Sequence, residues 1–243
     1  MGLYTQFQQK RKIRQRIEEE ASCSWSYLTM NVLATVMATY GLFSNSQVVI
    51  IGAMIVAMLL GPIVGISLSL VDNNKNLLLK GVDSLAHGII SVFVVAFFLG
   101  IVHRDIPLTN EIFMRTTTSV MDLMIALSGG AAAAFATVST RFGSAFIGVA
   151  VATAIVPPLA ASAILLARGE IHLGIGALFL AFVNMAAVQF AASVVLWIVG
   201  FRKITKLNGG GFQVFLKRSV LYLFILFVLG TVLSLNFQQV LAR

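Results

Sequence analysis

The residues best placed to bind a solute are three prolines at matched positions in two long apolar runs. A shift of 96 residues superposes the runs without a gap and places Gly61-Pro62 on Pro157-Pro158. Proline removes a backbone donor and clashes with the preceding helical turn. Paired broken helices of this kind are typical of transporter binding sites. We therefore predict that Gly61, Pro62, Pro157 and Pro158 end half-helices around a shared cavity, and two ordinary kinks are the alternative.

Ionisable and amide side chains inside apolar segments are the next candidates, because they are costly there without a function. Asp122 could bind a cation or a proton, or it could cap a helix or pair with Arg115. Asn184 could bond carbonyl groups freed by a broken helix, or it could clamp two helices together. Asn45 and Ser46 open the second apolar run, and Ser128 lies among small residues of the fourth. These five residues complete the predicted solute site.

Catalytic and metal-binding patterns are absent from the sequence. It has no nucleophile–base pair, no Cys/His ligand spacing, and no phosphate-binding or dinucleotide-binding loop. The three histidines lie in separate segments, and the single Cys23 cannot form an internal disulfide. We expect no catalytic residue, no metal and no cofactor, so an enzyme is the least favoured class.

The composition is that of an integral membrane protein. Of 243 residues, 58% are hydrophobic and 11% are charged, whereas soluble domains carry about 25% charged residues. The apolar residues form runs of about 20 residues, the length that crosses a bilayer. Seven spans are predicted, at 26–43, 47–71, 84–102, 119–139, 145–167, 173–200 and 219–237.

The spans are predicted to contain an internal repeat. Spans one to three map onto spans four to six with the same 96-residue offset. Because three is odd, the two units enter the membrane from opposite sides and must be inverted relative to each other. The predicted fold is therefore all-α and polytopic, with six of about seven transmembrane helices in two inverted three-helix repeats that contain broken helices.

The distribution of Lys and Arg predicts the orientation, because positive residues concentrate on the cytoplasmic side. With the N-terminus inside, the inner side holds 13 of the 17 basic residues and the outer side holds Arg104, Arg115, Arg168 and Arg243. This bias explains the net charge of +8 without nucleic acid. We expect a multi-pass protein of a prokaryotic cytoplasmic (inner) membrane, with the lipid bilayer as a partner.

The sequence divides into segments of distinct character. The basic leader is predicted to form an amphipathic helix on the cytoplasmic surface, or a solvated segment that only sets orientation. The predicted segments are the leader 1–25, repeat one 26–102, an external loop 103–118, repeat two 119–200, a Gly/Lys/Arg linker 201–218 and an additional C-terminal helix 219–243.

Several motifs resemble a known family. The segments Ile51–Ala57, Leu60–Ile63 and Val156–Ala160, with Asn184, resemble the "uncharacterised hydrophobic domain" family of prokaryotic membrane proteins, also called domain of unknown function 389. The resemblance implies a membrane fold and no established activity. One position departs from the family pattern, which usually has a proline after the alanine that Ala57 matches. This chain has Met58 there, so the first break is expected at Gly61-Pro62.

These expectations lead to one function and its alternatives. We expect a transporter that moves a small solute or ion by alternating access around the two breaks. A passive channel would use the same breaks to line a pore. A membrane assembly or sensor protein would use its small-residue faces to hold partners. The small repeats suggest a homo-oligomer, either a dimer or a trimer.

Overall fold

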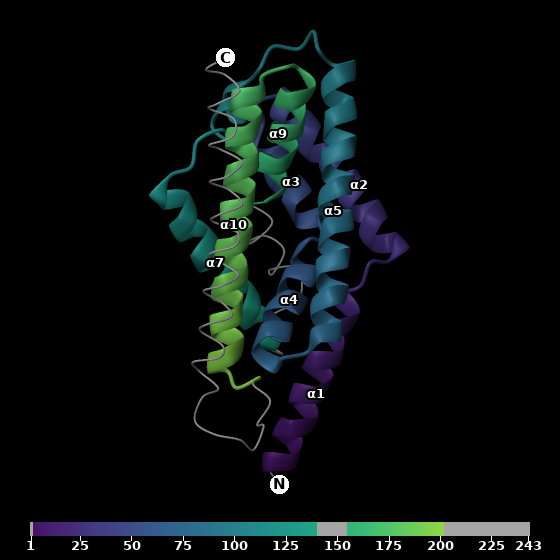
Figure 1. Cartoon of the computed structure of the whole chain (residues 1–243), viewed down its shortest axis with the longest axis vertical. Coiled ribbons are helices and arrows are strands. Elements are labelled where there is room, and N and C mark those ends of the chain that lie inside the picture. Colours follow the sequence, from purple (N-terminus) through teal and green to yellow (C-terminus); the bar gives the residue numbers. More distant parts are fainter. Residues whose placement is uncertain (1, 140–154, 202–243) are drawn as a thin grey trace.

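The protein is a bundle of long helices. The computed structural model describes residues 2–139 and 155–201, and those ranges contain helices and no strand. Figure 1 shows the helices packed along one long axis, with α1 at the lower end. The helices of the described ranges are α1 Gly2–Glu20, α2 Trp25–Phe43, α3 Gln47–Val56, α4 Leu60–Asp72, α5 Lys75–Val102, α6 Asn110–Phe113, α7 Val120–Val138, α9 Val156–Ala167 and α10 Ile171–Ile198.

Within residues 2–139 and 155–201, three helices are long and apolar enough to cross a membrane. They are α5, α7 and α10, and the bent pair α3–α4 makes a fourth if it is one span. Large apolar side chains point outward from α5, where Ile90, Val94 and Phe98 are each more than half exposed. Such a surface is suited to lipid rather than water. The described residues are therefore those of a membrane-type helical protein. Of the seven predicted spans, the last lies outside the described residues.

The loop predicted between Asp72 and Asp83 is wrong, because only two residues separate α4 from α5. Asn73 adopts the left-handed conformation, with φ of 55°, and ends α4. The side chain of Asn74 then accepts a hydrogen bond from the amide of Leu77 and caps α5. The first turns of α5 are polar, so hydropathy alone missed them and placed the start at residue 84.

The predicted break in the second span exists, but it lies earlier than expected. Helices α3 and α4 are bent by 55° at Ala57, Met58 and Leu59. Pro62 lies in the first turn of α4, where a missing amide hydrogen costs no helical hydrogen bond. The expectation of a break at Gly61-Pro62 is thus corrected. Proline marks the start of the second half-helix, and the bend precedes it.

The prolines of the second half occupy the same position in their helix. Pro157 and Pro158 follow Val156 in the first turn of α9. The break was predicted at these two prolines, and they instead lie inside the first turn of α9. Residues 140–154, which include the first part of the predicted span 145–167, lie outside the described residues.

The helices also repeat with the spacing seen in the sequence. Helix α9 begins 96 residues after α4, and α10 begins and ends 96 residues after α5. Helices α2 and α7 are both 19 residues long. In Figure 1, α4 runs downward from mid-height while α9 runs upward, and α5 and α10 run in opposite directions. Corresponding helices of the two halves therefore point opposite ways.

The N-terminal helix docks on the ends of two core helices. Arg14 forms an ion pair with the buried Asp72 at the end of α4, with 2.7 Å between Nη2 and Oδ2. The same nitrogen donates to the carbonyl of Phe201, beyond α10. Lys10 donates to the carbonyls of Val199 and Gly200 at 3.2 Å each. Helix α1 thus satisfies carbonyl groups that every helix end leaves without an intrahelical partner.

Candidate functional site

An amide side chain from α2 bonds the backbone at the break. The Asn31 Oδ1 atom accepts a hydrogen bond from the amide of Met58, at 2.9 Å. Asn31 is fully buried, so this bond supplies a partner that lipid could not offer. We predicted that Asn184 bonds carbonyl groups freed by a broken helix, or clamps two helices together. At the first break it is Asn31 that bonds the freed backbone, and the group that it bonds is an N–H donor rather than a carbonyl.

The space beside this first break is filled by side chains. A Cβ atom on Gly88, which lies halfway along α5, would sit 2.5 Å from Leu59 and closer still to the hydroxyl of Tyr27. That hydroxyl donates to the carbonyl of Ser84 at 2.9 Å. Glycine at position 88 therefore lets α2 and the break approach α5 closely.

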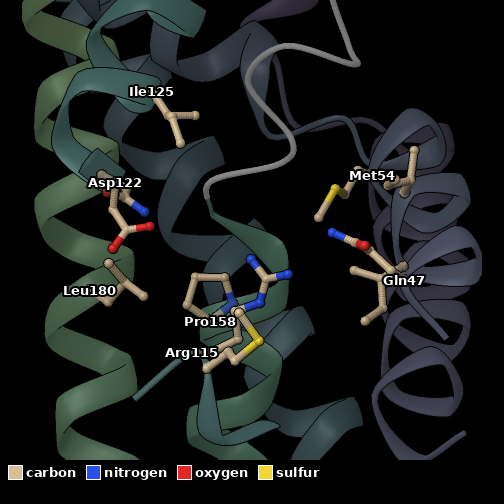
Figure 2. Close-up of a pocket in the computed structure, with 11 residues that line it drawn as sticks. Gln47, Met54, Arg115, Asp122, Ile125, Pro158 and Leu180 are labelled. Carbon is tan, nitrogen blue, oxygen red and sulfur yellow. The ribbon is translucent and has the colours of Figure 1, made fainter. Parts of the chain in front are cut away.

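A cavity of about 230 Å³ lies on the other side of the bundle, between α3, α7, α9 and α10. Figure 2 shows its labelled side chains converging from these helices and from the segment before α7. Four polar or charged side chains contribute to a wall that is otherwise apolar. The lining residues are Gln47, Ile50, Ile51, Met54, Met114, Arg115, Asp122, Ile125, Pro158, Leu180 and Asn184.

The cavity reaches half the length of α10. Asn184 is the fourteenth of the 28 residues of α10, and it is buried. Pro158 contributes from the first turn of α9, which is the position that Pro62 holds in α4. The residue 96 positions before Asn184 is Gly88, the fourteenth of α5. At corresponding positions, the first half therefore has Gly88, which packs against the α3–α4 break, and the second half has Asn184, whose side chain lines the cavity.

Asp122 caps the helix that carries it. Its Oδ2 atom accepts hydrogen bonds from the amide and the hydroxyl of Ser119, at 2.9 and 2.7 Å. The Ser119 hydroxyl oxygen in turn accepts from the amide of Asp122 at 3.1 Å. This reciprocal capping box starts α7, and a carboxylate there is favoured by the helix dipole. Of the roles predicted for Asp122, helix capping is therefore observed, and the same residue also lines the cavity.

Arg115 is the charged cavity residue that was not among the predicted site residues. It was assigned to an external loop, but its side chain lines the cavity. Its Nη2 atom pairs with Glu111 at 3.3 Å rather than with Asp122. Its Nε atom is buried and has no hydrogen-bond partner within residues 2–139 and 155–201. The signal available in the sequence was the i,i+4 spacing of Glu111 and Arg115, which is typical of a helical turn.

Asn45 supports this arrangement from outside the cavity. It adopts a positive φ of 53° in the α2–α3 turn, which asparagine tolerates better than most residues. Its Oδ1 atom accepts from the amide of Glu111 at 3.0 Å. Because Glu111 pairs with Arg115, Asn45 helps to position the Arg115 side chain.

The nine predicted site residues separate into two groups. Asp122, Pro158 and Asn184 line the cavity, whereas Asn45, Ser46, Ser128, Gly61, Pro62 and Pro157 are not among its lining residues. Ser128 is exposed on α7. A Cβ atom on Gly61 would collide with the Glu20 carbonyl of α1, so this glycine serves close packing. Within the described ranges, no group of three His, Cys, Asp or Glu side chains could hold a metal ion.

Comparison with known proteins places the chain in a family. Residues 54–190 match the family described as a domain of unknown function (DUF389). An uncharacterized protein of Methanocaldococcus jannaschii is 33% identical over 181 residues. The chain belongs to the DUF389 family. The match with the archaeal DUF389 relative covers 74% of this chain but only 56% of that relative, so the chain spans little more than half of its length. No solved structure matches the chain.

Proposed function

We propose that this protein is a membrane transporter that moves a small solute by alternating access. The observation that carries the proposal is the polar cavity at half the length of α10, beside the first turn of α9. Transporters bind their substrates near the bilayer midplane, between repeats and against broken helices. The cavity joins residues of both halves, because α3 belongs to the first and α7, α9 and α10 to the second.

An inverted repeat is part of this proposal. Equal spacing of α4–α5 and α9–α10, together with their opposite directions in Figure 1, supports two units related by an axis in the membrane plane. Such units can exchange conformations and so open a central site to either side. The seven-span topology, the N-inside orientation in a prokaryotic cytoplasmic membrane and a dimer or trimer belong to the same proposal. No catalytic step is required of the protein.

Side-specific cysteine labelling tests the proposal. Cys23 is exposed, so it is first replaced by Ser, and Leu180→Cys then adds a thiol to the cavity wall. A transporter exposes this thiol to a membrane-impermeant methanethiosulfonate reagent from either face of sealed vesicles, without a single-channel current. Ile164→Cys, fully buried in α9, is the matched control and stays unlabelled.

Other outcomes would point to the alternatives. Labelling from both faces together with a single-channel current identifies a passive channel. An unlabelled thiol at position 180 from both faces overturns transport and leaves an assembly or sensor protein.

A further inference from the structure

We propose that the cavity binds a small zwitterion with an apolar side chain, such as an aliphatic α-amino acid. This inference rests on the proposed function for its biological meaning, but the binding itself is a separate property. It is carried by two side chains of opposite charge, Arg115 and Asp122, that line one small and otherwise mostly apolar cavity.

The charged groups keep unused hydrogen-bonding capacity toward the cavity. Arginine has five N–H donors, and among the described residues Arg115 uses one of them, at Nη2, in its ion pair with Glu111. A ligand carboxylate in the cavity would accept a charge-assisted hydrogen bond from the remaining donors of the guanidinium. Figure 2 shows the Arg115 guanidinium rising between Asp122 and Gln47.

Asp122 offers the complementary charge. Among the described residues, both hydrogen bonds that its carboxylate accepts end on Oδ2, so Oδ1 can accept from a ligand ammonium group. The carboxylate and the guanidinium do not form an ion pair with each other, since Arg115 is paired with Glu111. Two opposite charges held apart are complementary to a molecule that carries both charges itself.

The rest of the wall sets the size and polarity of the ligand. Ile50, Met54 and Leu180 provide an apolar surface, which favours an aliphatic side chain. The cavity of about 230 Å³ is smaller than the range of about 300–1,000 Å³ that drug-sized ligands occupy. A free amino acid has a suitable size, whereas a peptide or nucleotide does not.

A simple amine is the competing ligand. Arg115, Glu111 and Asp122 together carry one net negative charge, which an amine would neutralise. An amine would, however, offer the Arg115 guanidinium no acceptor. The two ligand classes therefore differ by the carboxylate alone, and probes that differ in this group separate them.

The experiment uses the purified full chain in detergent and isothermal titration calorimetry. The probes are L-leucine, 3-methylbutylamine, which lacks the carboxylate, and 4-methylpentanoate, which lacks the amine; L-valine and L-methionine extend the series. We expect leucine to bind at least ten-fold more tightly than either single-charge analogue. The inference would be overturned if 3-methylbutylamine bound as tightly as leucine or more tightly. It would also be overturned if none of the three amino acids bound.

Matched variants assign the two charges. Arg115→Gln is expected to weaken leucine at least ten-fold and to leave the amine unchanged. Asp122→Asn keeps a side chain that can cap α7 and is expected to weaken leucine and the amine alike. Arg11→Gln, on the exposed face of α1, is the control and changes neither. Circular dichroism and size-exclusion profiles verify folding, and a variant that binds leucine like the parent chain removes its residue from the site.

Binding and transport fail in distinguishable ways. Leucine that binds but is not taken up by proteoliposomes keeps this inference and contradicts the transporter. Uptake of 3-methylbutylamine without uptake of leucine would support the proposed transport and contradict the proposal that the ligand is a zwitterion.

Discussion

The Oδ1 atom of Asn31 accepts a hydrogen bond from the backbone amide of Met58 at 2.9 Å, across the break between α3 and α4. A broken helix frees backbone groups that the apolar surroundings cannot satisfy. One buried amide from a different helix therefore stabilises the bent conformation, and the bend depends on α2 as much as on its own sequence.

Replacing Asn31 tests the importance of this bond. Asn31→Leu has nearly the same volume but leaves the Met58 amide without its acceptor, so we expect a loss of about 1–3 kcal/mol of stability. The midpoint of thermal unfolding in detergent measures it. Leu33→Ala, at a half-exposed position of the same helix, is the control and is expected to change the midpoint little. Equal midpoints for Asn31→Leu and the parent chain would show that water satisfies the amide.

Proline at position 58 provides a second test of the same contact. Ala57 has ψ of 136°, the extended conformation that a following proline requires. Met58→Pro removes the donor and leaves Asn31 unsatisfied, so it is expected to destabilise the parent chain. In the Asn31→Leu background the acceptor is already absent, so Met58→Pro leaves no acceptor unpaired. We expect the same proline to lower the free energy of unfolding by less. A double-mutant cycle measures this coupling, and strictly additive effects would contradict it.

Two glycine-to-alanine substitutions are expected to act in opposite directions. A Cβ atom on Gly130 of α7 would lie 2.5 Å from the carbonyl oxygen of Val188 in α10. Because backbone atoms cannot yield as a side chain can, Gly130→Ala is expected to cost about 1–3 kcal/mol. Gly52→Ala meets only the end of Met37, at 3.8 Å, and is expected to gain up to about 1 kcal/mol from helix propensity. Chemical unfolding of both variants measures the difference, and the same sign for both would be the contrary result.

Gln189 is expected to be replaceable by an apolar residue. Its side chain is buried, and neither of its polar atoms has a hydrogen-bond partner within the described ranges. Gln189→Leu removes both unsatisfied groups at similar volume, so we expect a gain of about 1–3 kcal/mol. The thermal midpoint measures this, with Gln189→Ala as the control that also creates a cavity. A lower midpoint for the leucine variant would indicate that the amide holds bound water.

Removing Arg14 is expected to release α1 from the core. Arg14→Ala loses the ion pair to Asp72 and the bond to the carbonyl of Phe201. Because Arg14 is one-third exposed, solvent screening reduces the effect, and we expect a loss of about 1–3 kcal/mol. Trypsin cleavage at Lys12, followed by mass spectrometry, should become faster. Gln15→Ala, on the exposed side of α1, is the control, and equal cleavage rates for the two variants would contradict the contact.

The helices were predictable from the sequence to the extent that a hydrophobic run coincides with a helix. The ends of α2 and α7 lie within one residue of the predicted spans. Ser119 and Asp122 have the spacing of a capping box, and helix capping was one of the roles predicted for Asp122. The first turns of α5 are an exception, because their residues are polar. A hydropathy profile does not distinguish such turns from a loop.

The break and the cavity depend on contacts that no local pattern contains. Proline restricts where a helix can begin, but which preceding residues bend is decided by a partner for the freed amide. That partner, Asn31, lies 27 residues before Met58. Arg115 reaches the cavity because Asn45 holds the Glu111 amide across 66 residues. Sequence reasoning therefore found Asp122, Pro158 and Asn184, and it missed Gln47 on α3 and the arginine supplied by a connecting segment.

The docking of α1 makes it a mechanical strut between two elements of the core. Its C-terminal end touches α4 at Gly61 and, through Ala21 just after the helix, at Gly65. Lys10 and Arg14 bond carbonyl groups of the segment that follows α10. A change in the separation of those two helix ends must break one set of contacts or carry α1 along. At about 28 Å for 19 residues, α1 converts a small shift at its docked end into a larger sweep of its other end. The position of α1 at this end of the bundle is therefore coupled to the conformation of the core helices α4 and α10.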